Sequence, residues 1–578
     1  MKKLLSLCLA LSLLAGCVSF AAAEGGSEIY MRNYPVYACE VDVKTTKDWP
    51  LFFTADADDM PFIDLEELAD LVNVMENQVY NKPDFKLTYA HEGSVFTLTR
   101  ENGFWMKVDF SNGTITFNDY NAFVQKPDHQ SLLDMLSFSG YNESGEAELF
   151  QRDARASYDR YGDSMLVDLE EYGIPYMMDQ DRGYIPLQTA NDFVVSGLTA
   201  RSFLFNSQAV FFAGTNDLFN NNENKYTPLG DLYYAAAPAE RSQLFADFGA
   251  AELALMLDCQ YGLKKKHNFD TFVHTFWEIG FDEPLSSVSA ADADRALYSF
   301  IGYYLDDLHS GFGLLSWMAG RDTKLEGGYG PSSRLSDNQE EQYKDLRKSM
   351  LGENAEGYLE VGNTAYITFD HFESNYSAAS YYQAKANGDR LDDTIGLMIY
   401  AHQQVTRENS PVENVVIDLS CNTGGDADAA LFVISWILGE AEVSVEDSFT
   451  GAQSTMVYRA DVNMDRVFNE MDALKNKRVY CLISPVSFSC GNLVPAVCKA
   501  NQAVTLIGRT SGGGACVVQP VSTAWGSTFN ISGNSRLSFR KNGSFYDIDE
   551  GIAPDVYISR LETLYDRQKL TDLINSLP

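Results

Sequence analysis

Positive charge is scarce in this sequence. The 578 residues include 43 Lys and Arg against 81 Asp and Glu, which gives a formal net charge of −38. A field of that sign repels phosphate backbones and anionic lipid surfaces, and this excludes a nucleic-acid partner. Hydrophobic residues make up 45% and charged residues 21% of the chain, as in globular proteins that bury a core. About three domains are expected, because a domain usually holds roughly 100–200 residues.

The residue patterns that bind zinc are missing as well. No CxxC or HExxH pattern occurs, and Cys and His do not cluster at zinc-ligand spacing, so no metal and no cofactor is predicted. Seven cysteines follow residue 23, an odd and dispersed number that does not form a disulfide framework. The acidic segment from Asp461 to Asp472 follows calcium-loop spacing. Arg466 replaces the glycine needed at the sharp turn, which favours a solvated acidic loop over a calcium site.

Long apolar runs are confined to the start of the chain. Residues 1–23 join two lysines, an apolar stretch and small residues, so a signal peptide is predicted. Two cleavage patterns overlap there: Leu14-Ala15-Gly16-Cys17 matches a bacterial lipobox, with a lipid anchor at Cys17, and Ala21-Ala22-Ala23 suits ordinary cleavage. No later run approaches the ~18 apolar residues that span a bilayer. We expect an extracellular or bacterial cell-surface protein, secreted or held by a lipid.

The remaining chain divides into segments of different pattern. Residues 27–220 alternate short apolar strands with turns and are predicted to form α+β accessory modules. Residues 221–325 have helical spacing and predict a helical subdomain, and 326–356 is a polar, Gly-rich linker. Residues 357–578 alternate strands with helices, and strands such as Val479–Ile483 are apolar on both faces. This predicts an α/β core with a mostly parallel sheet, with functional residues at its strand-to-helix turns.

Two of these turns carry residues suited to chemistry. The turn SCNTGG contains Gly424 and Gly425, which let backbone N–H groups point into a cleft, although a tight turn without a ligand is the commoner explanation. The turn SFSCGN contains Ser487 and Ser489 at the start of a helix. A nucleophilic hydroxyl would be exposed there near the positive end of the helix dipole, but a serine that only caps the helix is commoner.

A histidine base for such a serine must lie upstream, because no His follows His402. That order excludes the α/β-hydrolases, in which the His follows the Ser. His309 is the strongest of the seven histidines, since it lies in the segment DDLHSG, where a helix breaks beside two carboxylates. His274 and His402 lie within apparent helices and are interpreted as packed or solvated.

Five motifs, in order, resemble the C-terminal-processing and tricorn-core serine peptidase family. They are LDDLHS, IDLSCNTGG, SFSCGN, LIGRTSGGG and GIAPD, and they cover the chain from about Tyr298 to its end. The resemblance implies a ββα-type α/β peptidase core and an exported serine endopeptidase that acts on a protein or peptide. It also implies Ser489 as the nucleophile and His309 as the base. The N–H of Cys490, with one from Gly424 or Gly425, would form the oxyanion hole.

One departure from the family pattern concerns lysine. Family members with a Ser-Lys dyad carry a Lys where this chain has Gly514, and no Lys occurs between Lys499 and Lys541. Only about 45 residues separate Phe312 from Tyr358, which leaves no room for a PDZ domain. The sequence therefore resembles the branch without a PDZ domain that uses Ser with His and an acid.

A second departure concerns the acid, which the resemblance places just before Gly551. The expected position, three residues earlier, is Ile548, and Asp547, Asp549 and Glu550 compete for the role. We select Asp549. In addition, Asn492 stands where the family usually has Glu.

Two other functions remain open. A catalytically inactive peptide- or cell-wall-binding protein on the same fold would also fit, because each site residue has a structural explanation. Cysteine chemistry at Cys490 ranks lowest, since the side chain after a nucleophile normally points elsewhere.

Overall fold

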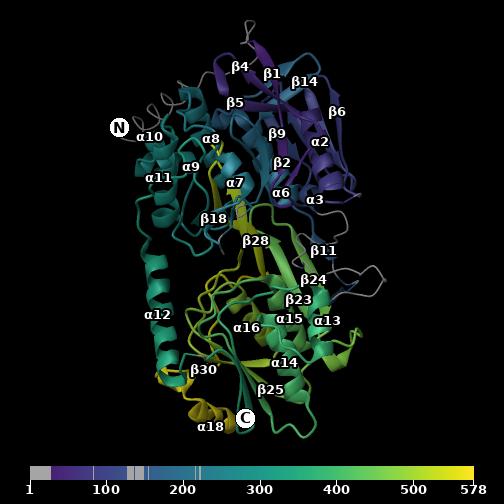
Figure 1. Cartoon of the computed structure of the whole chain (residues 1–578), viewed down its shortest axis with the longest axis vertical. Helices are drawn as coiled ribbons and strands as arrows, with labels where there is room; N and C mark the ends of the chain where they lie inside the picture. Colours follow the sequence, from purple (N-terminus) through teal and green to yellow (C-terminus); the bar gives the residue numbers. More distant parts are fainter. Residues whose placement is uncertain are drawn as a thin grey trace.

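The computed structural model describes residues 28–577, except 83, 126–135, 137–148, 154, 156, 215–216, 221–222 and 354. The signal peptide and both cleavage patterns lie outside the described residues. The molecule is elongated, with the N-terminal sheets and the helical segment at one end and the α/β core at the other (Figure 1). Several sheets and helices make it a multi-domain α/β protein.

Three sheets build the N-terminal end. Their strands are antiparallel except for the pair β2–β16, and β7 shows the alternation of buried and half-buried residues that a one-sided sheet requires. The first sheet is β1 (Ile29–Tyr34), β4 (Trp49–Thr54), β5 (Ala57–Asp64), β14 (Arg182–Pro186) and β13 (Met177–Asp179). The second is β12 (Met165–Asp168), β9 (Thr114–Phe117), β8 (Trp105–Asp109), β7 (Val95–Arg100) and β6 (Leu87–Glu92). The third is β15 (Ser202–Phe205), β16 (Val210–Ala213), β2 (Val36–Ala38) and β3 (Val43–Lys44).

Short helical segments connect these strands. They are α2 (Leu65–Val74), η2 (Met75–Val79), α3 (Tyr120–Val124), α4 (Leu169–Tyr172), α5 (Leu187–Ala190), η3 (Asn191–Val195) and α6 (Ser196–Thr199). Asp64 caps α2 by accepting the backbone N–H groups of Glu66 and Glu67. A small hairpin, β17 (Phe219–Asn220) and β18 (Lys225–Tyr226), leads into α7 (Pro228–Tyr233).

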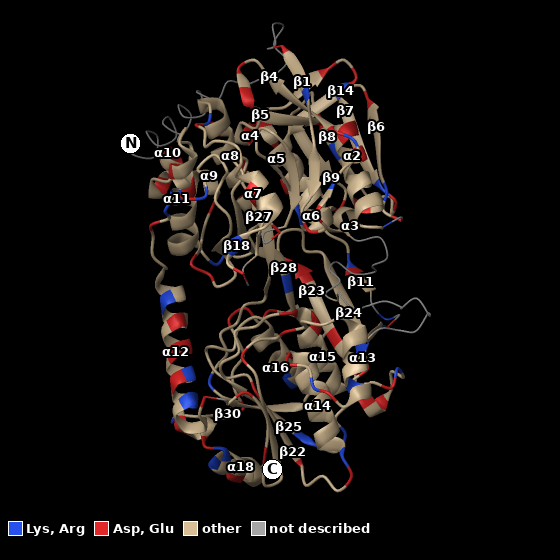
Figure 2. Ribbon diagram, in the orientation of Figure 1, with Lys and Arg blue, Asp and Glu red and all other residues tan. Residues whose placement is uncertain are grey.

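The helical segment follows, with α8 (Gln243–Gln260), α9 (Phe272–Ile279), α10 (Asp282–Leu285), α11 (Ala290–Phe300) and the π-helical turn η4 (Ile301–Leu305). Most of the predicted 326–356 linker is helical: α12 spans Pro331–Leu351. Figure 1 shows α12 along one side of the molecule, bridging its two ends. Along this helix Figure 2 shows positions of Lys and Arg interspersed with positions of Asp and Glu.

The core sheet has the order β20-β21-β22-β25-β26-β30. Its bounds are β20 (Gly357–Val361), β21 (Thr364–Thr368), β22 (Asn414–Asp418), β25 (Arg478–Ile483), β26 (Val504–Gly508) and β30 (Val556–Tyr557). Only the edge pair β20–β21 is antiparallel, so the sheet is mostly parallel, as the doubly apolar strands predicted. The associated helices are α13 (Ala378–Asn387), α14 (Thr394–Thr406), α15 (Ala427–Leu438), α16 (Cys490–Ala500), α17 (Glu562–Tyr565) and α18 (Arg567–Ser576).

A second large sheet joins strands from distant parts of the sequence. Its path is β10 (Phe150–Arg152), β24 (Gln453–Ala460), β23 (Ala441–Asp447), β28 (Thr528–Lys541) and β19 (Gly311–Phe312). Beside this path, β11 (Ser157–Arg160) pairs with β24, and β27 (Cys516–Ser522) and β29 (Ser544–Tyr546) pair with β28. The short β19 lies two residues after His309. Its pairing with β28 fixes the helical segment to the α/β core.

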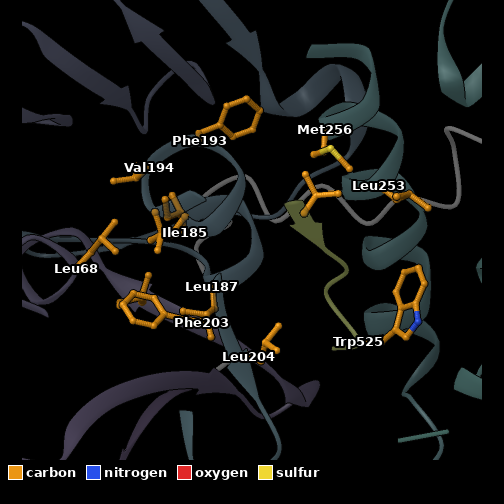
Figure 3. Close-up of a cluster of buried hydrophobic side chains, with 14 of the residues drawn as sticks. Leu68, Ile185, Leu187, Phe193, Val194, Phe203, Leu204, Leu253, Met256 and Trp525 are labelled. Carbon is orange, nitrogen blue, oxygen red and sulfur yellow. The ribbon is translucent and has the colours of Figure 1, made fainter. Parts of the chain in front are cut away.

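One hydrophobic core is shared between the two ends of the molecule. It contains residues of the N-terminal sheets, of α8 and of the β27–β28 region, including Trp525, Phe529 and Ile531. Figure 3 shows Trp525 in the same cluster as Leu253 and Met256 of α8, with Phe203 and Leu204 of β15. The predicted segments 27–220 and 221–325 therefore pack around a common interior, not around separate ones.

The acidic segment from Asp461 to Asp472 is only partly solvated, because its first and last carboxylates are buried. Asp461 is fully buried and accepts the N–H groups of Asp465 and Arg466, and Asp472 accepts those of Asn463 and Asn469. These two carboxylates therefore bind backbone N–H groups of their own loop. Within the described ranges, no group of three or more His, Cys, Asp or Glu side chains is placed to hold a metal ion. None of the described helices is both long enough and apolar enough to cross a membrane.

Candidate active site

Ser489 lies at the carboxyl edge of the core sheet, between β25 and α16. Its backbone has φ 54° and ψ −123°, a conformation that a non-glycine residue adopts only when its surroundings enforce it. The Ser489 N–H donates to the carbonyl of Gly513 at 2.9 Å, and the Ser489 side chain makes no capping hydrogen bond to α16. Ser489 therefore does not act as the cap of α16.

Ser487 has a different role. Its side chain is fully buried, and its hydroxyl donates to the Leu419 carbonyl at 2.7 Å and accepts the Ser484 N–H at 2.9 Å. Both bonds hold the turn together. Of the two serines in the motif, only Ser489 carries a hydroxyl that is not committed to the fold.

The Gly loop, defined as Thr423-Gly424-Gly425, packs directly against Ser489. A Cβ added to Gly424 would lie 2.6 Å from Ser489 Cβ and 3.1 Å from Ser489 Oγ, so a side chain there would occupy the space of the nucleophile. Gly424 and Gly425 have φ of 107° and 131°, which other residues rarely adopt. The paired glycines are therefore required by both space and backbone conformation.

The backbone N–H groups around Ser489 differ in their availability. The Gly424 N–H donates to Asn422 Oδ1 at 2.9 Å, and the Gly424 carbonyl accepts the Phe372 N–H at 2.8 Å. Since C=O and N–H point in opposite directions across a trans peptide, the Gly425 N–H points away from Phe372. Within the described part of the chain, neither this N–H nor that of Cys490 at the first position of α16 has an acceptor. Gly425 and Cys490, not Gly424, have the available donors.

The Cys490 side chain is not arranged for nucleophilic chemistry. Its Sγ lies 3.2 Å from the Gly425 carbonyl oxygen, and the residue is 6% exposed. Burial raises the pKa of this thiol to about 12, so it is protonated at neutral pH. This arrangement disfavours cysteine chemistry.

His309 is placed beside the nucleophile by the turn after η4. Its ring packs on that of Phe488, the neighbour of Ser489, with ring centroids 4.8 Å apart. Asp307 accepts the backbone N–H of His309 at 3.1 Å and also accepts the hydroxyls of Tyr261 and Ser532, which fixes the turn. Burial lowers the pKa of His309 against the opposing effects of Asp307 and Asp549, which favours the neutral imidazole that a base requires. The structure records no hydrogen bond between the His309 and Ser489 side chains.

Of the three competing carboxylates, Asp549 is the buried one. It is 8% exposed, its Oδ1 accepts the Ala515 N–H at 3.0 Å, and its Oδ2 lies 3.0 Å from Lys266 Nζ. Burial acts to raise the pKa of Asp549, but Lys266 and the Ala515 N–H lower it below its usual value, so the group is ionised. The Glu550 side chain is 83% exposed, and the half-exposed Asp547 pairs with Arg536.

The position that the family resemblance assigned to the acid holds Ile548, which is 1% exposed and belongs to the hydrophobic core. Its carbonyl accepts the Asn492 side-chain N–H at 3.0 Å. Asn492 Oδ1 in turn accepts the Ser511 hydroxyl at 2.7 Å, and Ser511 Oγ accepts the Ile552 N–H. Asn492 thus fastens the segment that carries Asp549 to the helix that follows Ser489.

Three residues near the site were not selected in the sequence analysis. Lys266 bonds Asp549 and Glu550, and the neighbouring His267 stacks on Phe269 with ring centroids 5.3 Å apart. His371 Nδ1 lies 3.1 Å from the hydroxyl oxygen of Thr423 in the Gly loop. A weak signal existed for the first two, because Lys264-Lys265-Lys266 is a run of three lysines in a strongly acidic chain.

Comparison with known proteins supports the resemblance. Residues 363–558 match the model of Peptidase family S41, a range that contains Ser489, the Gly loop and Asp549 but not His309. A protein of Chlamydia pneumoniae is 31% identical over 102 residues, which are 18% of this chain and 16% of that protein.

Two solved structures are similar to parts of the chain. The photosystem II D1 C-terminal processing protease is 18% identical, covers 36% of this chain and 46% of its own length, and gives a TM-score of 0.26. Mature CPAF is 13% identical, covers 57% of this chain and 96% of its own length, and gives a TM-score of 0.34. The chain thus spans less than half of the first of these and a small part of the Chlamydia relative. Residues 363–558 form a domain of peptidase family S41, a family of serine-type peptidases.

Proposed function

We propose that this protein is an exported serine endopeptidase that hydrolyses peptide bonds through an acyl-enzyme on Ser489, with His309 as the base. The observation that carries the proposal is the conformation of Ser489. Its backbone is held at φ 54° beside the Gly loop. Its hydroxyl neither caps a helix nor forms a buried hydrogen bond. Strain of this kind concentrates at sites where geometry is needed for chemistry.

The chemistry then uses the groups around the hydroxyl. Neutral His309 takes the Ser489 proton as Oγ attacks the substrate carbonyl, and the imidazolium later gives that proton to the leaving amine. The N–H groups of Gly425 and Cys490 bind the oxyanion, at the positive end of α16. Loss of one such donor lowers kcat by roughly 10²–10³ in a well-studied serine peptidase. The Asp549 carboxylate stabilises the imidazolium through space.

A phosphonate probe tests the nucleophile and the base separately. A fluorophosphonate should label the wild-type chain at one site, Ser489→Ala should abolish labelling and proteolysis, and His309→Ala should reduce both by at least ~10³. Ser544→Ala, which alters an exposed serine on β29, is the control and should behave as wild type. Full labelling of Ser489→Ala would refute the nucleophile.

The export part of the proposal rests on residues 1–23 alone. In a bacterial host, incorporation of radiolabelled palmitate that is lost in Cys17→Ser would show a lipid anchor. A mature chain that starts at Glu24 and carries no label would show ordinary secretion. Retention of the full-length chain in the cytoplasm would contradict both forms.

A second candidate, an inactive peptide- or cell-wall-binding protein, is favoured by one observation. Both carboxylate oxygens of Asp549 are occupied, by Lys266 and by the Ala515 N–H, and no bond joins Ser489 to His309. Binding of an unfolded protein without cleavage, by wild type and Ser489→Ala with equal affinity, would support this alternative.

A further inference from the structure

Helix α12 is unusual because the N-terminal half of it has no buried residue. The helix has 21 residues, roughly 30 Å at 1.5 Å per residue, and its buried residues are Tyr343 and Arg347 near the C-terminal end. Every residue from Pro331 to Gln342 is exposed or half-exposed. A helix that is polar all round is typical of a solvent-exposed bridge between domains. Its two ends therefore determine what it does.

The first end is tied to the turn that carries His309. Asp306 accepts the N–H groups of Ser332 and Ser333 at 2.8 and 3.1 Å, and also the Ser333 hydroxyl. It thus caps α12 from 26 residues away in the sequence. Gly330 allows this approach, because a Cβ there would overlap the Asp306 carboxylate. Asp306 has φ 39° and directly precedes Asp307, which holds the backbone N–H of His309.

The second end is tied to the end of β21. Arg347 Nη1 and Nη2 donate to the two oxygens of Asp370, both at 2.6 Å, and the residues are 5% and 6% exposed. A buried bidentate pair fixes both position and orientation, because the planar guanidinium matches the carboxylate. Tyr343, one helical turn earlier, is 2% exposed and packs in the same cluster as Cys421.

Asp370 is in turn bonded to the Gly loop through its backbone. The Asp370 carbonyl accepts the Thr423 N–H at 3.1 Å. Two residues on, Phe372 donates its N–H to the Gly424 carbonyl and accepts the Asp426 N–H, both at 2.8 Å. These bonds set the plane of the Gly424–Gly425 peptide, and with it the direction of the Gly425 N–H.

We propose that Arg347 is a positioning residue for the oxyanion loop. Through Asp370 it fixes the segment Asp370–Phe372, which aims the Gly425 N–H at the reacting carbonyl, and through α12 the same pair is joined to the His309 turn. The inference rests on the proposed function. It adds that the base and the oxyanion donor are held by one helix, and that a residue without contact to the reacting groups governs the chemical step.

The test compares three variants in the full mature chain. Arg347→Met should lower kcat for a peptide substrate about 10²-fold with KM little changed, because a misplacement of ~1 Å in reacting groups has an effect of that size. Arg347→Lys keeps the positive charge but loses the planar group that bonds both carboxylate oxygens. Its kcat should lie between those of the wild type and Arg347→Met. The ascending limb of the pH profile should keep its midpoint in both, because His309 is unaltered.

The double variant Arg347→Met with Asp370→Leu separates positioning from stability. Replacing both members of a buried pair by apolar groups is often neutral for stability, whereas removing one leaves an unpaired charge. We expect the double variant to unfold at the wild-type temperature while its kcat stays at least tenfold low. A peptide aldehyde, which forms a tetrahedral adduct, should bind it at least tenfold more weakly. A cleaved product peptide should bind it normally.

A matched control lies on the same sheet. Arg407 makes a bidentate pair with Glu360 of β20, with side chains 36% and 22% exposed, and Arg407→Met should leave kcat unchanged. If the double variant regains kcat together with its stability, the pair is only structural and the proposal is wrong. A wild-type chain that neither cleaves peptides nor reacts with the phosphonate would overturn the proposed function itself. An active wild type with unaltered Arg347 variants would overturn only this inference.

Discussion

Two sets of buried acids, one in each end of the molecule, are neutralised differently. In the α/β core, Asp370 pairs with Arg347, Asp418 with Arg567, and Asp549 with Lys266. In the N-terminal end, Asp192 of η3 and Glu252 of α8 are 2% and 1% exposed, and neither Asp192 Oδ2 nor Glu252 Oε1 has a hydrogen-bond donor among the described residues. Burial and the neighbouring Glu252 raise the pKa of Asp192, and burial raises the pKa of Glu252 to about 7, so the pair holds a proton near neutral pH. Charge is therefore retained in these three core pairs and reduced at the contact between Asp192 and Glu252.

The difference indicates how each end uses its buried polar groups. The core pairs tie together elements that hold the nucleophile, the Gly loop and the acid, and a fixed charge supplies both direction and strength. The N-terminal pair joins η3 to α8 inside the shared core. There a proton takes the place of a cation, so this contact depends on pH while the core pairs persist.

Separating the two ends should have the largest effect. A fragment that begins at Gly357 would expose Trp525, Phe529 and Ile531, which are at most 1% exposed in the whole chain, and would remove β19 from the edge of β28. We expect it to lack a cooperative thermal transition and to bind a hydrophobic dye, as loosely packed states do. A chain that begins at residue 28 is the control. A fragment that melts cooperatively would show that the shared core is dispensable.

Removing the charge of the acid should have the next largest effect. Asp549→Asn should lower kcat/KM by about 10²–10⁴, because the imidazolium of His309 loses its carboxylate. Asp547→Asn and Glu550→Gln alter the two exposed competitors and should change kcat/KM by less than tenfold. Steady-state kinetics on one peptide decides among the three. If either control variant loses more kcat/KM than Asp549→Asn does, the residue altered in that control is the acid.

Removing only the cation beside the acid should shift the pH profile. Asp549 raises the pKa of His309, and Lys266 partly neutralises Asp549, so Lys266→Met should raise the pKa of His309 further. Since His309 acts as a base, the ascending limb of kcat/KM should move to higher pH, with less than tenfold loss of activity below it. Lys265→Met alters the exposed neighbour and should leave the limb in place. A shift to lower pH would contradict this electrostatic arrangement.

The N-terminal acid pair should affect stability and leave kcat unchanged. Burial raises the pKa of Glu252 from 4.5 to about 7, so the folded state holds a proton that the unfolded state releases at lower pH. The stability of the wild type should therefore fall as pH rises from about 4.5 through 7. Glu252→Gln should reduce this slope and melt higher than wild type at pH 8, with no difference near pH 4. Glu278→Gln, on the exposed face of α9, is the control, and equal slopes in all three would refute the shared proton.

The sequence supports prediction of the core because its signals are local. Doubly apolar strands indicate a covered parallel sheet, and Gly424, Gly425 and Ser489 follow such strands directly. Only the family resemblance separated Ser489 from Ser487, because the physical difference between them does not show in the residue pattern. It is the backbone angle of Ser489 and two hydrogen bonds of the Ser487 hydroxyl, one to Leu419, 68 positions away, and one to Ser484 in the same turn.

The remaining features depend on contacts between distant residues. Lys266 and Asp549 are 283 residues apart, and no spacing rule connects them. Helix α12 has no apolar stripe, and its cap, Asp306, lies 26 residues away, so the usual signals of a helix are absent. The second large sheet takes β10, β11 and β19 from outside the core. The pattern of consecutive segments in the sequence therefore cannot predict this sheet.

The conformation of Ser489 has an evolutionary consequence. A serine at φ 54° costs of order 1–3 kcal/mol of folding free energy, a fraction of what a typical domain possesses. Glycine would relieve that strain at the expense of the hydroxyl. A descendant released from selection for cleavage would therefore gain stability by exchanging Ser489 for glycine, and binding proteins could arise from this scaffold through a change that is favourable from its first step.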